Sequence, residues 1–187
     1  MAELGTEWES LFDGKTGDGL PASWRMDSGA LVTVGGQAPM PIRTRRRFTT
    51  FELAWEWKVA ARANSGVKYR LYAVRFSANG SVGDGVGYEY QLSDDAGDPG
   101  ARTDAKQRGG CLYGVTAMEK TAARAVEEWN ESRVLVHRDH VEHWLNGLLT
   151  AREAVDLPFT SPISLQHHNS ELRFRNIRIR AIPSGAR

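Results

Sequence analysis

Polar and apolar side chains alternate in two stretches of the chain, and the polar ones include acidic, basic and amide groups that can do chemistry. Glu89 and Gln91 alternate with tyrosines in one stretch, and Lys68, Arg70 and Tyr72 alternate with apolar residues in an earlier one. Successive side chains of a strand point to opposite faces. If the two strands share a sheet, a carboxylate, an amide, two cations and aromatic edges meet on one face. That combination is typical of a sugar-binding or sugar-cleaving surface.

Most of the chain consists of strand-like stretches separated by Gly, Asp, Asn and Pro. Residues 51–59 alternate cleanly and predict a half-buried strand. Further strands are expected near residues 30–34, 66–73, 85–92, 133–137, 140–145, 163–166 and 172–182. The stretch 117–128 is the one helical candidate, with a loop that has one helical turn as its alternative.

Three local patterns refine this prediction. Arg138-Asp139 fits a tight two-residue turn, and Asn146-Gly147 is the stronger turn signal. The last strand changes phase, because Leu172 and Phe174 have one parity and Ile177 and Ile179 the other. A bulge at residues 175–176 would keep all four in the core. Many short strands and few helices predict an antiparallel β-sandwich.

Length and charge narrow the class of protein. The chain has 187 residues and a formal charge of +1, from 24 basic and 23 acidic residues. We expect one domain spanning 1–187, with a core from about residue 8 to about 182. Balanced charge predicts no nucleic-acid partner, and the short basic run 43–47 fits a solvated sheet edge. No apolar run is long enough to span a membrane.

The single cysteine and the first residues of the chain bear on disulfide formation and on the cellular compartment. Cys111 is the single cysteine, so no internal disulfide is possible, and we expect it to be a buried, small apolar residue. The first residues lack the regions of a secretory signal, so the sequence as written predicts a cytoplasmic protein. A periplasmic or secreted location follows if a leader has been removed.

Short motifs spread over nearly the whole chain resemble the 3-keto-disaccharide hydrolase domain family. In order they are Leu11-Phe12-Asp13-Gly14, Asn64-Ser65-Gly66, Gly87-Tyr88-Glu89-Tyr90-Gln91 with Asp94, Leu112-Tyr113-Gly114, Glu128-Trp129-Asn130, residues 141–147, Leu165-Gln166-His167-His168 and the Arg-Asn-Ile-Arg-Ile run at 175–179. The resemblance implies an all-β, concanavalin A-like jelly-roll β-sandwich of two antiparallel sheets. It also implies a carbohydrate substrate, a glycoside oxidised to a ketone at carbon 3, cleaved by elimination or hydrolysis. The chain departs from the family in its compact region 112–129 and in lacking a signal peptide.

A ketone at carbon 3 makes the carbon 2 proton acidic, so cleavage requires a base, a group that stabilises the enolate, and an acid for the leaving group. Glu89 is the expected base, or a metal ligand if a divalent ion takes the electrophilic role, and Arg70, Lys68 or that bound metal ion could stabilise the enolate. Tyr113 could donate a proton. The sequence makes no cofactor certain, a divalent metal ion is one option, and metal dependence and oligomeric state stay open.

The remaining candidates hold the sugar or assist the base. Asn64 and Gln91 would bind hydroxyl groups, and Asp94 would be a second carboxylate, although Gln91 in place of an acid argues against a two-carboxylate glycosidase. His168 is expected to be a base or metal ligand, with a hydrogen-bonded histidine at a strand end as the alternative.

Each candidate has a plainer alternative. Glu89 and Arg70 could form only a cross-strand ion pair on a solvated face. His137, His140 and His143 lie across an expected hairpin, so we interpret them as strand residues rather than a metal cluster, with His143 packing internally. At the level of the whole protein, the alternatives are a non-catalytic carbohydrate-binding module or lectin, and a domain that binds a protein through its sheet face.

Overall fold

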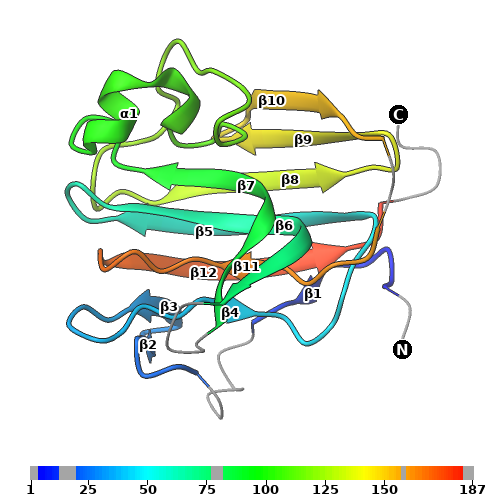
Figure 1. The fold of residues 1–187 in the computed structure, drawn as a ribbon, viewed down its shortest axis with the longest axis horizontal. Coiled ribbons are helices and arrows are strands. Elements are labelled where there is room, and N and C mark those ends of the chain that lie inside the picture. The colour runs from blue at the N-terminus through cyan, green and yellow to red at the C-terminus, as the bar shows by residue number, and fades with distance from the viewer. Residues whose placement is uncertain (1–3, 13–19, 77–81, 157–158, 183–187) are drawn as a thin grey trace.

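Two antiparallel β-sheets face each other in the computed structural model, which describes residues 4–12, 20–76, 82–156 and 159–182 (Figure 1). The strands are β1 (Glu9–Ser10), β2 (Trp24–Asp27), β3 (Ala30–Thr33), β4 (Ile42–Arg43), β5 (Phe51–Val59), β6 (Asn64–Phe76), β7 (Val82–Ser93), β8 (Asn130–Val136), β9 (His140–Leu145), β10 (Leu148–Ala154), β11 (Ser164–Leu165) and β12 (Leu172–Arg180). The large sheet has the order β10-β9-β8-β5-β12-β3-β2, with β1 beside β12, and the small sheet has the order β4-β11-β6-β7. The expected all-β jelly-roll sandwich is confirmed.

The large sheet forms where alternation in the sequence is cleanest. In β5 the odd-numbered side chains from residue 51 to 59 are buried, as predicted. In β12 the register against β5 shifts between Arg175 and Arg178, and Asn176 has a φ of +51°. This bulge confirms the predicted phase change and leaves the apolar residues on both sides of it buried in the core.

Both predicted turns are present. β8 and β9 join through residues 138–139, closed by a hydrogen bond from the backbone N–H of His137 to the carbonyl of His140 (2.9 Å). Asn146 and Gly147 join β9 to β10 with φ values of +49° and +84°. Two successive positive φ angles match the right-handed twist of a hairpin, and Asn-Gly is the pair best able to adopt them.

Aromatic residues fill the space between the sheets, and the polar atoms of Trp57 and Tyr90 are paired there. The largest fully buried side chains include Trp57, Tyr69, Tyr90 and Phe174. Trp57 Nε1 donates to Ser132 Oγ (2.7 Å), which also bonds the Tyr90 hydroxyl (2.8 Å). These aromatic rings can therefore be buried without leaving a polar group unsatisfied.

Helical structure in the described residues lies in the loop after β7. A short helix, α1 (Pro99–Thr103), is followed by a 3₁₀ turn, η1 (Ala105–Gln107). Asp98 caps α1 by accepting from the N–H of Gly100, and Pro99 occupies the first turn. The helical candidate 117–128 is a loop, and its turn at residues 126–127 is not helical, because Glu127 has a φ of +63°. No helix in the described residues is long and apolar enough to cross a membrane.

Candidate active site

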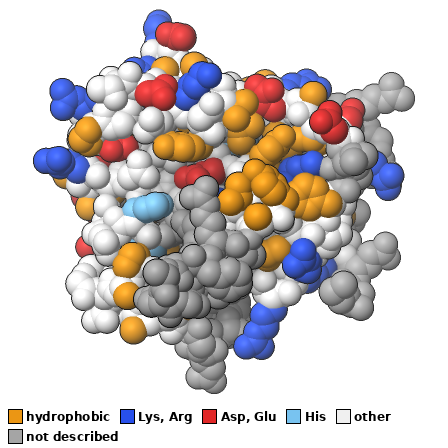
Figure 2. Space-filling view, in the orientation of Figure 1, with side chains coloured by type: hydrophobic (Ala, Val, Ile, Leu, Met, Phe, Trp, Pro, Cys, Tyr) orange, Lys and Arg blue, Asp and Glu red, His pale blue; other side chains and the backbone are white. Residues whose placement is uncertain are grey.

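A row of polar side chains covers the outer face of the small sheet, opposite the core. In the antiparallel pairing of β6 and β7, Lys68 lies opposite Glu89 and Gly66 lies opposite Gln91. The residues between them, including Val67 and Tyr90, are buried on the inner face. Figure 2 views this face and shows acidic side chains near its centre, with hydrophobic side chains gathered on one side and a histidine on the other.

The Glu89 carboxylate lies between a cation and an amide. Lys68 Nζ is 3.3 Å from Glu89 Oε2, and Gln166 Nε2 donates to the same oxygen at 3.3 Å. The side chains of Lys68 and Glu89 are only 13% and 14% exposed, so water screens their attraction less than at an open surface. The carboxylate is therefore held in a fixed position with one oxygen fully engaged.

A glycine makes room for this arrangement. A Cβ atom on Gly66 would lie 2.6 Å from Glu89 Oε1 and 2.7 Å from Gln166 Oε1, closer than real Cβ contacts allow. The side chains of Glu89 and Gln166 thus converge directly over the backbone of residue 66. The motif Asn64-Ser65-Gly66 has a role beyond shaping a turn, because its glycine lies beneath the carboxylate.

Gln91 and Asn64 extend the polar row toward the α1 loop. With the Gln91 amide in the orientation that satisfies both its polar atoms, its nitrogen donates to Glu89 Oε1 (3.3 Å) and its oxygen accepts from Asn64 Nδ2 (3.1 Å). Asn64 Nδ2 also donates to Asp98 Oδ2 (2.8 Å). Asp98 is buried and accepts a further hydrogen bond from Ser93 Oγ, so one carboxylate both caps α1 and anchors the row.

Tyr113 belongs to the loop that covers this end of the small sheet. Its backbone N–H donates to the carbonyl of Glu89 (3.0 Å), and its side chain is 43% exposed. Partial burial, together with the carboxylates of Glu89, Asp104 and Asp98, raises the pKa of the Tyr113 phenol. The phenol therefore stays protonated at neutral pH and can act as a proton donor.

Arg70 lies at a break in strand alternation that the sequence did not reveal. Three residues of β6, 70–72, stand opposite the single residue Gly87 of β7, and Arg70 has a φ of +50°. The Arg70 side chain is buried, with its guanidinium over the rings of Tyr88 (5.6 Å) and Phe159 (4.8 Å). The residue directly across from Glu89 is Lys68, whereas the cross-strand ion pair considered from the sequence was that of Glu89 with Arg70.

Asp94 and His168 occupy loops at the ends of their strands. Asp94 directly follows β7, and its carboxylate accepts hydrogen bonds from the backbone N–H groups of Arg62 (2.8 Å) and Ala96 (3.2 Å). These bonds stabilise the loop conformation around it. His168 is exposed in the loop after β11. Its neighbour His167 is buried, 3.2 Å from the Val34 carbonyl through Nε2.

The three histidines around the β8–β9 hairpin do not converge. His137 and His140 stack on each other with ring centroids 4.2 Å apart. His143 is buried in the core instead, bonded to the Tyr69 hydroxyl (2.6 Å) and the Gly110 carbonyl (3.2 Å). Among the described residues, no group of three or more His, Cys, Asp or Glu side chains is arranged to hold a metal ion.

Two residues that hold the polar row in place, Gln166 and Asp98, were not predicted from the sequence. Gln166 belongs to the motif Leu165-Gln166-His167-His168 and directly follows β11. Its contact with Glu89 therefore depends on how β11 pairs within the small sheet. Asp98 could have been found, since an Asp followed by Pro and a short polar stretch signals a helix N-terminus. Its bond to Asn64, by contrast, is visible only in three dimensions.

The strand order and the polar row define a concanavalin A-like jelly-roll sandwich with a carboxylate-centred site on its small sheet. The chain belongs to the 3-keto-alpha-glucoside-1,2-lyase-like domain family, whose model matches residues 7–180. It is 25% identical to a 3-keto-disaccharide hydrolase of Bacteroides thetaiotaomicron, over 92% of this chain and 78% of that protein. The recognised resemblance is confirmed, and together these findings support a carbohydrate-active hydrolase.

Solved structures agree on the architecture. A candidate glycosyl hydrolase from Parabacteroides distasonis superposes with a TM-score of 0.72 and 27% identity, covering 94% of this chain and 88% of that one. A second protein of this description from the same organism has a TM-score of 0.74 and 23% identity, covering 94% and 100%. The carbohydrate binding module CBM66 from Bacillus subtilis shares the fold at a TM-score of 0.59 and 10% identity, over 97% and 99% of the two chains.

Proposed function

We propose that the chain cleaves glycosides carrying a ketone at carbon 3 of the sugar, with Glu89 as the base that removes the proton on carbon 2. The observation that carries the proposal is the Glu89 carboxylate, fixed between Lys68 Nζ and Gln166 Nε2 on the outer face of the small sheet. Family membership supports the substrate class. A positioned carboxylate next to a cation is what such a substrate requires.

The reaction begins with proton transfer from carbon 2 to the carboxylate. The electrons of that C–H bond move toward the ketone and generate an enolate, whose oxygen the Lys68 ammonium stabilises. The enolate then collapses, a double bond forms between carbons 1 and 2, the ketone re-forms, and the bond from carbon 1 to the aglycone oxygen breaks. The products are an unsaturated keto sugar and the aglycone.

Proton balance at the leaving group requires an acid. The Tyr113 phenol is protonated at neutral pH and lies on the loop bonded to the Glu89 backbone, so it supplies that proton in the proposal. Hydrolysis follows when water adds to carbon 1 of the unsaturated product and a proton returns to carbon 2. Asn64 orients the sugar hydroxyls in the proposal, and the fully buried Gln91 holds Asn64 and Glu89 in place rather than contacting the sugar. Arg70 lies at the bulge of β6, Asp94 follows β7, and the exposed His168 lies in the loop after β11.

The test is incubation of the protein with a 3-keto-glucoside in D₂O, with product identification by NMR. We expect wild-type protein to release the aglycone and, where water adds back, to leave deuterium at carbon 2. Glu89→Gln keeps the shape of the side chain but removes the base, so we expect at least about a 1000-fold loss of turnover with an unchanged unfolding midpoint.

Two controls sharpen the result. His168→Ala distinguishes the bases, because turnover that survives Glu89→Gln and disappears in His168→Ala would move the base to the β11 loop. A parallel incubation with a chelator shows whether a divalent ion shares the electrophilic role. Binding of glycosides without turnover of any 3-keto sugar by the wild type would instead make this a carbohydrate-binding module.

A further inference from the structure

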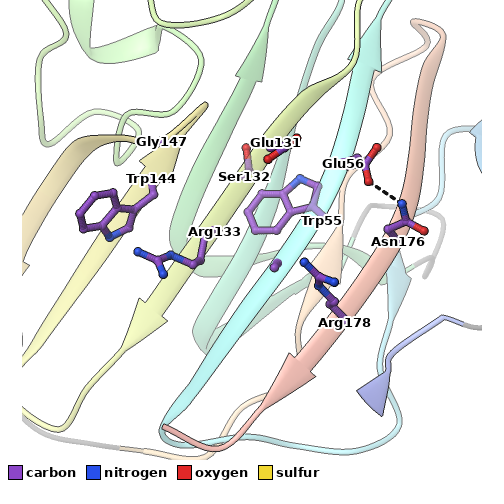
Figure 3. Close-up of a pocket in the computed structure, with 10 residues that line it drawn as sticks. Trp55, Glu56, Glu131, Ser132, Arg133, Trp144, Gly147, Asn176 and Arg178 are labelled. Carbon is purple, nitrogen blue, oxygen red and sulfur yellow. Dashed lines mark hydrogen bonds between the residues drawn. The ribbon is translucent and has the colours of Figure 1, made fainter. Parts of the chain in front are cut away.

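The outer face of the large sheet carries a hollow on the opposite side of the sandwich from Glu89. Its volume is about 460 Å³, and side chains from β5, β8, β9 and β12 line it (Figure 3). A hollow of this size is within the range of small-ligand sites. We propose that it is a second carbohydrate site, one that binds a neutral oligosaccharide chain without cleaving it.

Strand register builds the hollow around one small residue. Ala54 lies in β5 directly opposite Arg133 of β8 on one side and Arg178 of β12 on the other. With strands about 4.8 Å apart, the two arginine backbones stand about 10 Å apart across the alanine methyl group. The short side chain of Ala54 leaves a gap between the two long arginine side chains. This gap is wide enough for a sugar ring.

Trp144 forms an aromatic wall at one end of the same row. It pairs with Arg133 across β9 and β8, and the Arg133 guanidinium lies 4.7 Å from its ring centroid. Its indole Nε1 donates to Glu142 Oε2 (3.0 Å), so the ring is held at two points. Figure 3 shows Arg133 directed toward Trp144, with Arg178 reaching toward β5 from the other side. A fixed aromatic ring beside planar polar groups is suited to a pyranose, because little entropy is lost on binding.

The charges in the hollow select a neutral polar ligand. Arg133 forms an ion pair with Glu52, and Glu56 forms an ion pair with Arg175. In the part of the chain that the structure describes, neither Arg178 nor Glu131 has an ion-pair partner within 4 Å, although Arg178 lies over the Trp8 ring. One spare donor and one spare acceptor fit hydroxyl groups, which both accept and donate. The two arginines and two glutamates that line the hollow balance in charge, so an anionic ligand gains no net attraction there.

Glu131 provides an independent argument for ligand binding. It stands directly opposite Glu56 in the β5–β8 register, and like charges at that position destabilise a sheet. Arg175 and Asn176 satisfy Glu56, and Glu131 gains nothing from this arrangement. A locally unfavourable, exposed carboxylate at the edge of a hollow is the pattern expected of a functional residue.

The experiment titrates the intact protein with unoxidised neutral oligosaccharides, namely maltohexaose, cellohexaose, laminarihexaose and xylohexaose, with hexagalacturonate as the anionic comparison. Glu89→Gln is tested in parallel, and unchanged binding by that variant would locate the affinity outside the proposed catalytic site. We expect one or more neutral chains to bind. Trp144→Ala and Arg178→Ala should each weaken that binding at least about tenfold.

Trp129→Ala is the matched control, because Trp129 also stacks on outward cations, Arg175 and Lys58, but does not line the hollow. Its binding should equal that of the wild type. Glu131→Gln should bind several-fold more weakly while unfolding at an equal or higher temperature, a pair of readouts that a structural role would not give. Failure of the wild type to bind any neutral chain, undiminished binding by Trp144→Ala and Arg178→Ala, or preference for hexagalacturonate would overturn the proposal.

Discussion

Protonation of the buried His143 should set the acid limit of stability. Its Nε2 lies 2.6 Å from the Tyr69 hydroxyl and its Nδ1 lies 3.2 Å from the Gly110 carbonyl, which fits a neutral ring protonated at Nδ1. Complete burial lowers the pKa of His143 from 6.5 to about 4, and hydrogen bonds to the backbone of residues 110 and 111 offset only part of that effect. The folded protein therefore resists protonating this ring.

The direction of the pH dependence follows from proton counting. Between pH 6.5 and about 4, the unfolded chain carries a proton on His143 that the folded chain lacks, so the free energy of unfolding falls as the pH is lowered through this window. A pKa difference of this size corresponds to about 3 kcal/mol, all of it present above pH 6.5 and all of it lost below pH 4. Tyr69 and Tyr90, which contact the ring, have raised pKa values and stay neutral throughout.

The assay is urea unfolding of the wild type and of His143→Gln at half-unit pH steps from 7.5 to 4. Gln keeps a polar group near Tyr69 but does not titrate, so the difference between the two proteins isolates this residue from every other carboxylate and histidine. We expect the difference to be constant above pH 7 and to shrink by about 3 kcal/mol by pH 4. A difference that stays the same across the range would refute the reasoning.

Three further changes probe the site and the core. Gly66→Ala should lower turnover of a 3-keto-glucoside about 100-fold, because the new methyl group displaces Glu89 and Gln166; the backbone here is not left-handed, so circular dichroism should be unchanged. Lys68→Met should reduce kcat about 100-fold with KM changed only a few-fold, measured on the same substrate, since the ammonium acts on the enolate. Ser132→Ala should reduce the free energy of unfolding by about 1–3 kcal/mol in urea, because Trp57 Nε1 loses its acceptor in the core, whereas an unchanged midpoint would mean that this indole is otherwise satisfied.

Much of the fold could be predicted because its rules are local. The alternation of β5, the phase change at Arg175 and Asn176, and the Asn146-Gly147 turn each depend on a few neighbouring residues, and all three are present. The same parity argument correctly placed Lys68 and Glu89 on one face of the small sheet. The chemistry of the site was therefore visible wherever strands stayed regular.

The failures occur where a residue's direction is decided by a distant partner. Regular alternation ends at Arg70, where three residues of β6 stand opposite the single residue Gly87. The glycine lets the β6 backbone approach closely, because a Cβ at that position would lie 2.8 Å from the carbonyl oxygens of Tyr69 and Arg70. Gly87 is visible in the sequence, but the bulge that it permits in the opposite strand β6 could not be predicted from it. Gln166 was missed for a related reason, since only the pairing of β11 with β6 brings it to Glu89.

The position of β12 bears on how the chain assembles during synthesis. This strand, made last among those described, lies inside the large sheet between β5 and β3, and it also pairs with β1 near the start of the chain. Until residues 172–180 have left the ribosome, the large sheet lacks the strand that joins β5 to β3. The edges of β5 and β3 that face this gap then have unpaired backbone N–H and C=O groups. The large sheet can then close only after residues 172–180 have left the ribosome, and chaperones that shield exposed strand edges should matter until that point.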